Sequence, residues 1–200
     1  GYDWSFPYYR DMGFALQMGM TPEEILLISL HRGEDPASGG RLPQGHYGRV
    51  DLRIPTQSSP TGTQYLQAVG IAMGAKKEGI DEVVYVSSGE GATSEGEFFE
   101  AVNWAARDGY PVIFFVQDNR LAISVPVEHQ TAGASIFEAV GGFKGRNELP
   151  RGVQRDAESG GAGAHRGWAE SDSGQGGSAS STFLFGRPAE ISPQGGHRTG

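Results

Sequence analysis

The stretch from residue 82 to residue 126 constrains the fold most, because it reads in order as strand, glycine loop, helix, turn and strand. A run rich in Val and Tyr over 82–88 lacks strict alternation, which is typical of a strand buried on both faces. Apolar residues then recur at helical spacing up to Gly109, where the helix is expected to end, and a second apolar run covers 112–116. This pattern predicts a βαβ unit, in which a helix joins two parallel strands.

The start of this expected helix carries capping and charge signals. Thr93 or Ser94 can cap it, and Glu95 and Glu97 in its first turn suit the positive end of the helix dipole. A capped helix start also presents free N–H groups that bind phosphate. We therefore expect an anion site beside the glycine loop.

Oxygen-bearing side chains follow both strands of the unit. Glu90 comes just after the first strand, and Asp118-Asn119 come just after the second. The carboxyl ends of parallel strands share one edge, where open α/β sheets bind ligands. Carboxylate and amide oxygens suit Mg²⁺ or Ca²⁺. A metal and a phosphate are the natural occupants, although an ordinary βαβ unit of a nucleotide-binding domain also fits this stretch taken alone.

The glycine loop and the end of the second strand also resemble a known motif. GEG at 89–91, followed by DN and AIS, resembles the thiamin diphosphate motif, usually written GDG and ending in NN. With GATSEGEFFEA beside it, the motif is most similar to the alpha part of the E1 component of 2-oxo acid dehydrogenases. Glu in place of Asp is similar to the branched-chain members. The resemblance implies an α/β fold with a parallel sheet and flanking helices, the thiamin diphosphate-binding fold, here incomplete.

The same resemblance implies roles for the residues of the motif. Glu90, Asn119 and the main-chain carbonyl of Leu121 would hold Mg²⁺. The sequence departs from the family at Asp118, which replaces a common Asn, and at Arg120, which replaces a common Gly. The residues of the glycine loop that would bind the cofactor are Gly89, Glu90, Gly91 and Ala92.

An Arg beside aromatic residues lies near the start of the chain, in FPYYRD at 6–11. Taken alone, Arg10 is either a surface cation stacked on a ring or a phosphate clamp. The Tyr9-Arg10 pair resembles the family pair that binds the terminal phosphate of the cofactor. The planar guanidinium suits that role, because it forms paired, charge-assisted bonds to phosphate oxygens.

His46 is the histidine with a motif-like setting, in LPQGHYG. The family carries HYG or HWG here, near the cofactor cleft. We therefore weigh two roles for His46, a residue that lines the site and is a weak catalytic candidate, or a hydrogen-bonded structural residue.

The SSPTGTQ segment at 58–64 precedes an apolar helix. Taken alone, it is a turn and a helix cap. In the family the corresponding segment packs on the cofactor, through residues that match Ser59 and Thr61. In branched-chain members its flanking oxygens also hold K⁺, a role that would fall to Ser58, Pro60, Thr63 and Gln64.

The helix after this segment contains three glycines, Gly70, Gly74 and Gly79. Glycine inside a helix thins it for close packing, and glycine at its end terminates it. Either use is open for each of the three positions.

Composition excludes several classes of function. The 200 residues suit one domain or one domain and part of another, and the chain opens inside a motif without Met, so we expect an internal fragment. A net charge of −8 argues against nucleic-acid binding. The sequence has no long apolar run, which argues against a membrane span. It has no cysteine, which suits the cytoplasm.

The sequence changes character after about residue 145, so we divide it into a cofactor-binding part at 1–145 and a tail at 146–200. The tail is rich in Gly, Ser and Arg and shows no amphipathic period. Composition alone predicts a disordered, low-complexity segment.

A second hypothesis for the tail is that it is out of frame. One legal back-translation of Trp168–Ser192, displaced by one nucleotide, reads as a family-like strand, an HSYSDD loop and a basic RKYR run. The catalytic His of that loop would straddle Thr182 and Phe183. This hypothesis places a frameshift between about Lys144 and Val153, and an independent reading of the DNA tests it.

The resemblance implies an oxidoreductase that decarboxylates a 2-oxo acid and acylates lipoyl groups of an E2 partner, with branched-chain acids favoured over pyruvate. It implies thiamin diphosphate, Mg²⁺ and, less directly, K⁺. The E1 beta part would be separate or fused, giving an alpha2beta2 assembly or a fused homodimer. The alternatives are another thiamin diphosphate enzyme of the transketolase or decarboxylase type, or a non-catalytic fragment. We expect this piece alone to be inactive.

Overall fold

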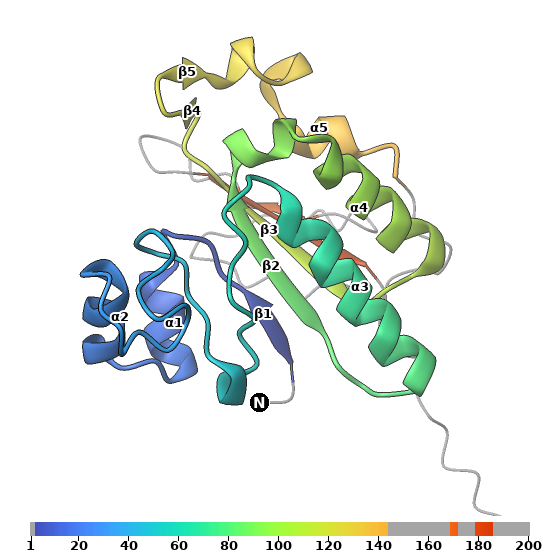
Figure 1. Cartoon of the computed structure of the whole chain (residues 1–200). Coiled ribbons are helices and arrows are strands. Elements are labelled where there is room, and N and C mark those ends of the chain that lie inside the picture. The colour runs from blue at the N-terminus through green and yellow to red at the C-terminus, as the bar shows by residue number, and fades with distance from the viewer. Residues whose placement is uncertain (1–2, 144–168, 172–178, 186–200) are drawn as a thin grey trace, which may run out of the picture.

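The computed structural model describes residues 3–143, 169–171 and 179–185 (Figure 1). Its centre is a five-stranded sheet with the order β1-β2-β3-β7-β6. The strands β1, β2 and β3 are parallel, whereas β7 and β6 are antiparallel to their neighbours. The bounds of the strands are Trp4–Phe6 (β1), Val84–Gly89 (β2), Val112–Asp118 (β3), Ala169–Ser171 (β6) and Ala179–Phe185 (β7).

The longest helices of the described residues cover one face of this sheet. Figure 1 shows α3 and α4 side by side on that face, with α1 and α2 grouped beside β1. None of the described helices has the length and apolar character needed to cross a membrane. The bounds of the helices are Met12–Met18 (α1), Pro22–Ser29 (α2), Thr63–Glu78 (α3), Gly96–Asp108 (α4) and Ile136–Val140 (α5).

The predicted βαβ unit is confirmed as β2, α4 and β3. The two strands pair in parallel from Val84 opposite Val112 to Gly89 opposite Gln117. Their carboxyl ends therefore lie side by side, as the sequence indicates. The expected fold class, an α/β fold with a parallel sheet and flanking helices, is confirmed.

The main core lies between the sheet and the helices α3 and α4. Aromatic rings fill its centre, with Tyr65 of α3 edge-on to Phe98 of α4 at 5.0 Å between ring centroids. Both side chains are fully buried. The edge-on interaction of two such rings contributes roughly 0.5–1.5 kcal/mol to stability in addition to the burial of their apolar surface.

The opposite face of the sheet is less covered by the described residues. Along β3, buried residues alternate with half-buried ones, so this strand is not buried on both faces. On the half-buried face, Phe14 of α1 stacks on Tyr85 at 4.7 Å, and Tyr85 lies 5.9 Å from Phe115. The expectation of burial on both faces concerns β2, where Val84, Val86 and Ser88 are buried on one face, whereas Tyr85 and Gly89 on the other face are half-buried. A run without strict alternation fits either degree of cover.

The expected side-chain cap of α4 is wrong. A 3-10 turn over Glu90–Ser94 comes first, and α4 begins at Gly96 with Glu95 as its N-cap and no side-chain bond there. The hydroxyl of Thr93 donates instead to the carbonyl of Glu90, at 2.7 Å. The glycine loop therefore turns back on itself before the helix starts. The predicted end of the helix is confirmed, since Gly109 adopts a left-handed conformation (φ 64°).

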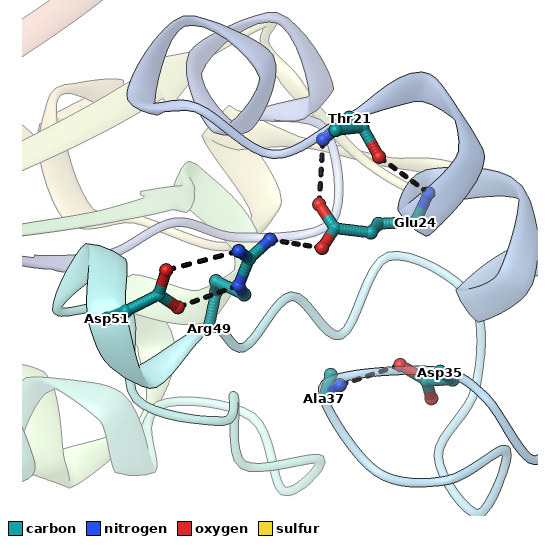
Figure 2. Close-up of polar contacts among 6 residues, drawn as sticks. All are labelled: Thr21, Glu24, Asp35, Ala37, Arg49 and Asp51. Atoms are coloured by element: carbon teal, nitrogen blue, oxygen red, sulfur yellow. Dashed lines mark hydrogen bonds and ion pairs between the residues drawn. The ribbon is translucent and has the colours of Figure 1, made fainter.

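The N-terminal helices α1 and α2 have a small core of their own. Thr21 and Glu24 form a reciprocal capping box at the start of α2, with bonds of 2.8 and 3.2 Å (Figure 2). Arg49 joins this helix to the following loop, because its guanidinium contacts Glu24 and also forms two bonds to Asp51, at 2.7 and 3.1 Å (Figure 2). In the same region, the Asp35 carboxylate accepts the Ala37 N–H at 2.7 Å (Figure 2).

The three glycines of α3 have different roles. Gly79 ends the helix in a left-handed conformation (φ 69°). A Cβ at Gly70 or Gly74 would meet no atom of the described residues within 4 Å, so packing within this part of the chain does not require glycine at either position.

The strands β6 and β7 lie within 146–200, where composition predicts no regular structure. The structure differs from that expectation at these two ranges, because β7 pairs along β3 from Asp118 opposite Ala179 to Val112 opposite Phe185. The N–H and C=O groups at the edge of β3 can bond an extended segment whatever its side chains. The other residues of this stretch lie outside the described ranges, and the frame hypothesis stays a prediction.

Candidate cofactor site

A cavity of about 440 Å³ opens at the carboxyl ends of β2 and β3. It receives residues from the loop after β1, the loops before α3, the glycine loop after β2 and the segment after β3. This is the edge of the sheet at which open α/β folds bind ligands.

The structure brings the predicted site residues together with one exception. Thr63 does not line the cavity, and its hydroxyl donates to the carbonyl of Pro60 at 2.9 Å. The predicted residues that do line it are Tyr9, Arg10, His46, Ser58, Ser59, Pro60, Thr61, Gln64, Gly89, Glu90, Gly91, Ala92, Asn119 and Leu121. These residues lie together around one cavity, while their roles as ligands stay predictions.

Glu90 is the buried carboxylate of this cavity, with 2% of its surface exposed. Its Oε2 lies 3.4 Å from the N–H of Asn119, whereas its buried Oε1 has no hydrogen-bond partner among the described residues. Its own carbonyl accepts from the Gln130 amide at 2.8 Å, which fixes the turn. A buried carboxylate oxygen without a partner is costly, and a cation is a natural way to offset that cost.

The neighbouring oxygens suit a divalent cation. Asn119 accepts the N–H of Leu121 through Oδ1 at 3.0 Å, and this oxygen has a second lone pair. The described residues contain no group of three or more His, Cys, Asp or Glu side chains that could hold a metal. The candidate site is instead a mixed set of one carboxylate, one amide and main-chain oxygen, which is the ligand type of Mg²⁺ with retained waters. These residues therefore fit the implied ion.

Tyr9 and Arg10 line the same cavity. The guanidinium of Arg10 donates to the hydroxyl of Tyr9 at 3.1 and 3.2 Å and lies 5.3 Å from the centroid of its ring. The hydrogen bond to Tyr9 raises the pKa of Arg10 further, so the residue stays charged. The position of Arg10 thus fits both roles weighed from the sequence, a cation stacked on a ring and a phosphate clamp, since the guanidinium beside Tyr9 also lines the cavity.

His46 lies in a position that fits both roles weighed from its sequence, and a catalytic role stays a prediction. It lines the cavity, and its Nε2 lies 2.9 Å from the hydroxyl of Ser59. The Nδ1 atom lies 3.4 Å from the carbonyl of Gln44. This contact joins two of the loops that the sequence analysis assigned to the site.

Sequence reasoning missed a polar network of Tyr8, Gln117 and Asp11, of which Tyr8 and Gln117 line the cavity. Tyr8 donates to Oε1 of Gln117 at 3.3 Å, and Gln117 donates to Asp11 at 2.6 Å. Burial raises the pKa of Tyr8 to about 12, so its hydroxyl stays protonated. Asp11 also accepts from Ser87 and, at 3.1 Å, from the main chain of Tyr8. The available signal was Gln117, a polar residue near the end of an otherwise apolar strand.

Close backbone approaches shape the walls of the cavity. A Cβ at Gly91 would lie 2.9 Å from the Cβ of Ala122, and one at Gly45 would lie 2.6 Å from the Cβ of Tyr9. Real Cβ atoms do not approach so closely, so both sites require glycine or a shift of the loop.

The parallel sheet and its cavity define an α/β protein whose carboxylate, amide and guanidinium groups suit a phosphate ligand with a bound metal. Residues 1–144 match the family model of the dehydrogenase E1 component. This range is more than half of the chain, and the protein belongs to the dehydrogenase E1 component family.

Curated relatives agree with this family. The chain is 43% identical over 141 residues to 2-oxoisovalerate dehydrogenase subunit alpha of Bacillus subtilis, covering 70% of this chain and 43% of the relative. It is 40% identical to 3-methyl-2-oxobutanoate dehydrogenase subunit alpha of Mycobacterium tuberculosis, covering 70% and 36%. It is 36% identical to pyruvate dehydrogenase E1 component subunit alpha of Bacillus subtilis, covering 68% and 34%. The chain thus spans less than half of the length of these relatives.

Proposed function

We propose that this chain is the cofactor-binding part of an E1 alpha subunit that binds thiamin diphosphate with Mg²⁺. The observation that carries the proposal is Oε1 of Glu90, which has no hydrogen-bond partner in the described part of the chain and is buried in a cavity that Arg10 and Asn119 also line. A buried carboxylate oxygen without a partner favours a bound cation, and a guanidinium that lines the same cavity favours a bound anion. A metal-bound diphosphate satisfies both needs with one ligand.

The residues of this chain would bind and orient the cofactor. Glu90, Asn119 and the main-chain carbonyl of Leu121 would hold Mg²⁺, and Arg10 beside Tyr9 would hold the terminal phosphate. Ser59 and Thr61 line the cavity from the loop before α3, where they would contact the organic part of the cofactor. When bound, thiamin diphosphate supplies a carbon nucleophile for the keto group and takes up the electrons left by CO₂.

The substrate that we propose is a 2-oxo acid with a branched chain. The Glu of the GEG loop supports this choice, as do the identities of 43% and 40% to relatives named for 2-oxoisovalerate and 3-methyl-2-oxobutanoate, against 36% to one named for pyruvate. The acyl group would pass to the lipoyl disulfide of an E2 partner, and reduction of this disulfide to the acylated dithiol would take up the two electrons of the oxidation.

The remaining parts of the proposal concern partners and a second ion. We propose an E1 beta part, separate or fused, that completes the active site, and a cytoplasmic location. We also propose a K⁺ site formed by Ser58, Pro60, Thr63 and Gln64; the carbonyl of Pro60 accepts from the hydroxyl of Thr63 at 2.9 Å and keeps a second lone pair. Thr63 also lies outside the cavity lining.

Isothermal titration calorimetry with the full chain tests the binding proposal. Thiamin diphosphate should bind in Mg²⁺ and lose that binding in EDTA, whereas ADP in Mg²⁺ should not bind. ADP binding without thiamin diphosphate binding would favour the ordinary nucleotide-binding unit instead.

A further inference from the structure

Asp118 and Arg120, on either side of the proposed ligand Asn119, contact each other. Asp118 ends β3 and is 5% exposed. Its Oδ1 accepts the main-chain N–H of Arg120 at 2.8 Å, and its Oδ2 lies 3.8 Å from Nη1 of the Arg120 guanidinium. The buried carboxylate thus has its cation two residues further along the chain.

The same guanidinium also reaches the far end of the following segment. Nη1 of Arg120 donates to the carbonyl of Ala134 at 2.9 Å. The backbone carbonyl of Arg120 accepts the N–H of Val127 at 3.1 Å. Arg120 therefore bonds to the start, the middle and the end of the stretch 118–134.

This stretch, which we call the metal loop, carries groups that shape the proposed Mg²⁺ site. It contains the hairpin of Leu121–Ala122 (β4) and Val125–Pro126 (β5), so it positions the carbonyl of Leu121. It also contains Gln130, whose side chain donates to the carbonyl of Glu90 at 2.8 Å. A shift of the metal loop would move both the ligands and the turn that presents Glu90.

Arg120 is held in a conformation that its side chain does not favour. Its φ of 68° lies in the left-handed region, where glycine fits without steric cost. An arginine at this position therefore has a steric cost in the backbone that glycine would not have. Its bonds to Asp118 and Ala134 supply a reason for its presence.

We propose that Arg120 is a positioning residue, which with Asp118 holds the metal loop in place for Mg²⁺ and thiamin diphosphate; this inference rests on the proposed function. Asp118 and Arg120, the two departures from the family pattern, then act together as one ion pair. The Asp118 carboxylate and the Arg120 guanidinium offset each other's charge. The pair therefore adds no net charge beside the diphosphate.

The test uses the full chain and the variants Arg120→Gly, Asp118→Asn and the double variant. His31→Gly is the matched control, since His31 is also left-handed (φ 52°) but lies outside the cavity lining. The first readout is the Mg²⁺ concentration that half-saturates thiamin diphosphate binding. The second is hydrogen exchange of amides 121–134 in metal-free protein.

Each single variant should raise the half-saturating Mg²⁺ concentration about 10-fold, the usual effect of removing a group that orients a ligand. Exchange in the metal loop should accelerate by a similar factor, about 10-fold. The double variant should show at most about 10-fold rather than about 100-fold, because both changes break the same pair and together restore the Asn and Gly that the family commonly carries. The midpoint of global unfolding of Arg120→Gly should not fall, and His31→Gly should leave Mg²⁺ dependence unchanged.

Three results would overturn the inference. An unchanged Mg²⁺ dependence in Arg120→Gly, whether or not the unfolding midpoint of this variant falls, would show that Arg120 has only a structural role. Multiplying effects in the double variant would show that Asp118 and Arg120 act separately. Absence of thiamin diphosphate binding by the unchanged chain at any Mg²⁺ concentration would remove the proposed function and this inference with it. Asp118→Asn supplies the same readouts if Arg120→Gly does not fold.

Discussion

The main-chain N–H of Asn119 lies 3.4 Å from Oε2 of Glu90, which joins the ends of two parallel strands across the base of the cavity. One carboxylate oxygen is thereby directed to the protein, and the other is left buried without a partner among the described residues. One oxygen of Glu90 thus contacts a backbone donor while the other has room for a ligand, which supports a cation site at Glu90.

Glu90→Gln should weaken Mg²⁺-dependent binding of thiamin diphosphate strongly. The charged ligand is lost while the size of the side chain is kept, so the Mg²⁺ concentration at half-saturation should rise ~100-fold. In EDTA, the free energy of unfolding should rise by about 1 kcal/mol, because a buried amide costs less than a buried unpaired carboxylate.

Calorimetry measures the first effect and urea unfolding the second. Glu100→Gln, on the exposed side of α4, is the control and should change neither. Equal Mg²⁺ dependence in the Glu90 variant and the unchanged chain would remove Glu90 from the metal site.

Arg10→Ala should reduce the affinity for thiamin diphosphate by ~10-fold and leave the affinity for phosphate-free thiamin unchanged. The reason is that charge-assisted bonds to a phosphate are lost and no contact to the organic part is touched. Competition binding of the two ligands measures the difference. Arg107→Ala, an exposed arginine of α4 that pairs with Asp108, is the control. A parallel loss for both ligands would contradict the phosphate role.

Two glycine substitutions should change stability in opposite directions. Gly62→Ala should lower the free energy of unfolding by about 1–3 kcal/mol, because Gly62 has φ 88° and a Cβ would lie 2.8 Å from the Cβ of Glu95. Gly74→Ala should raise it by about 0.5–1 kcal/mol, since this helical position has open space around its Cβ. Urea unfolding of both variants tests the pair. Stabilisation by Gly62→Ala would mean that the loop before α3 is not as tight as described.

Asp11→Asn should change the pH dependence of stability. Burial raises the pKa of Asp11, and hydrogen bonds from Ser87, the main chain of Tyr8 and Gln117 offset only part of that rise. A carboxyl with a raised folded pKa binds more protons when folded, so its contribution to stability falls as pH rises from the unfolded pKa, about 3.9, through the folded value. The unchanged chain should therefore lose stability relative to Asp11→Asn between acidic and neutral pH.

Urea unfolding at pH 4 and pH 7 measures this relative loss. Asp81→Asn, at an exposed position, serves as the control and should not show it. A constant difference between Asp11→Asn and the unchanged chain at both pH values would refute the raised pKa of Asp11.

Much of the fold and of the candidate site could be predicted from sequence, because the signals were local. The apolar runs and Gly109 mark the βαβ unit, and strand ends place Glu90 and Asn119 at one edge. Chain topology then brings distant residues together without further information, since parallel strands share a carboxyl edge. The resemblance added Arg10, which no spacing rule would connect to Glu90.

The remaining features depend on contacts that no local pattern encodes. The network of Tyr8, Gln117 and Asp11 joins residues far apart in the sequence, so only tertiary packing reveals it. Thr93 matched a capping residue, yet a 3-10 turn directs its hydroxyl to Glu90. Local hydrogen bonds of Thr compete with capping, and the surrounding loop decides between them.

Thermal unfolding of the full chain with Mg²⁺ alone, thiamin diphosphate alone and both together tests the central claim most directly. The cavity around Glu90 and Arg10 predicts a clear rise in Tm only when both are present, because the ion and the diphosphate complete each other's ligands. An equal rise with thiamin diphosphate in EDTA, or no rise with both together, would contradict a metal-bound cofactor at this site.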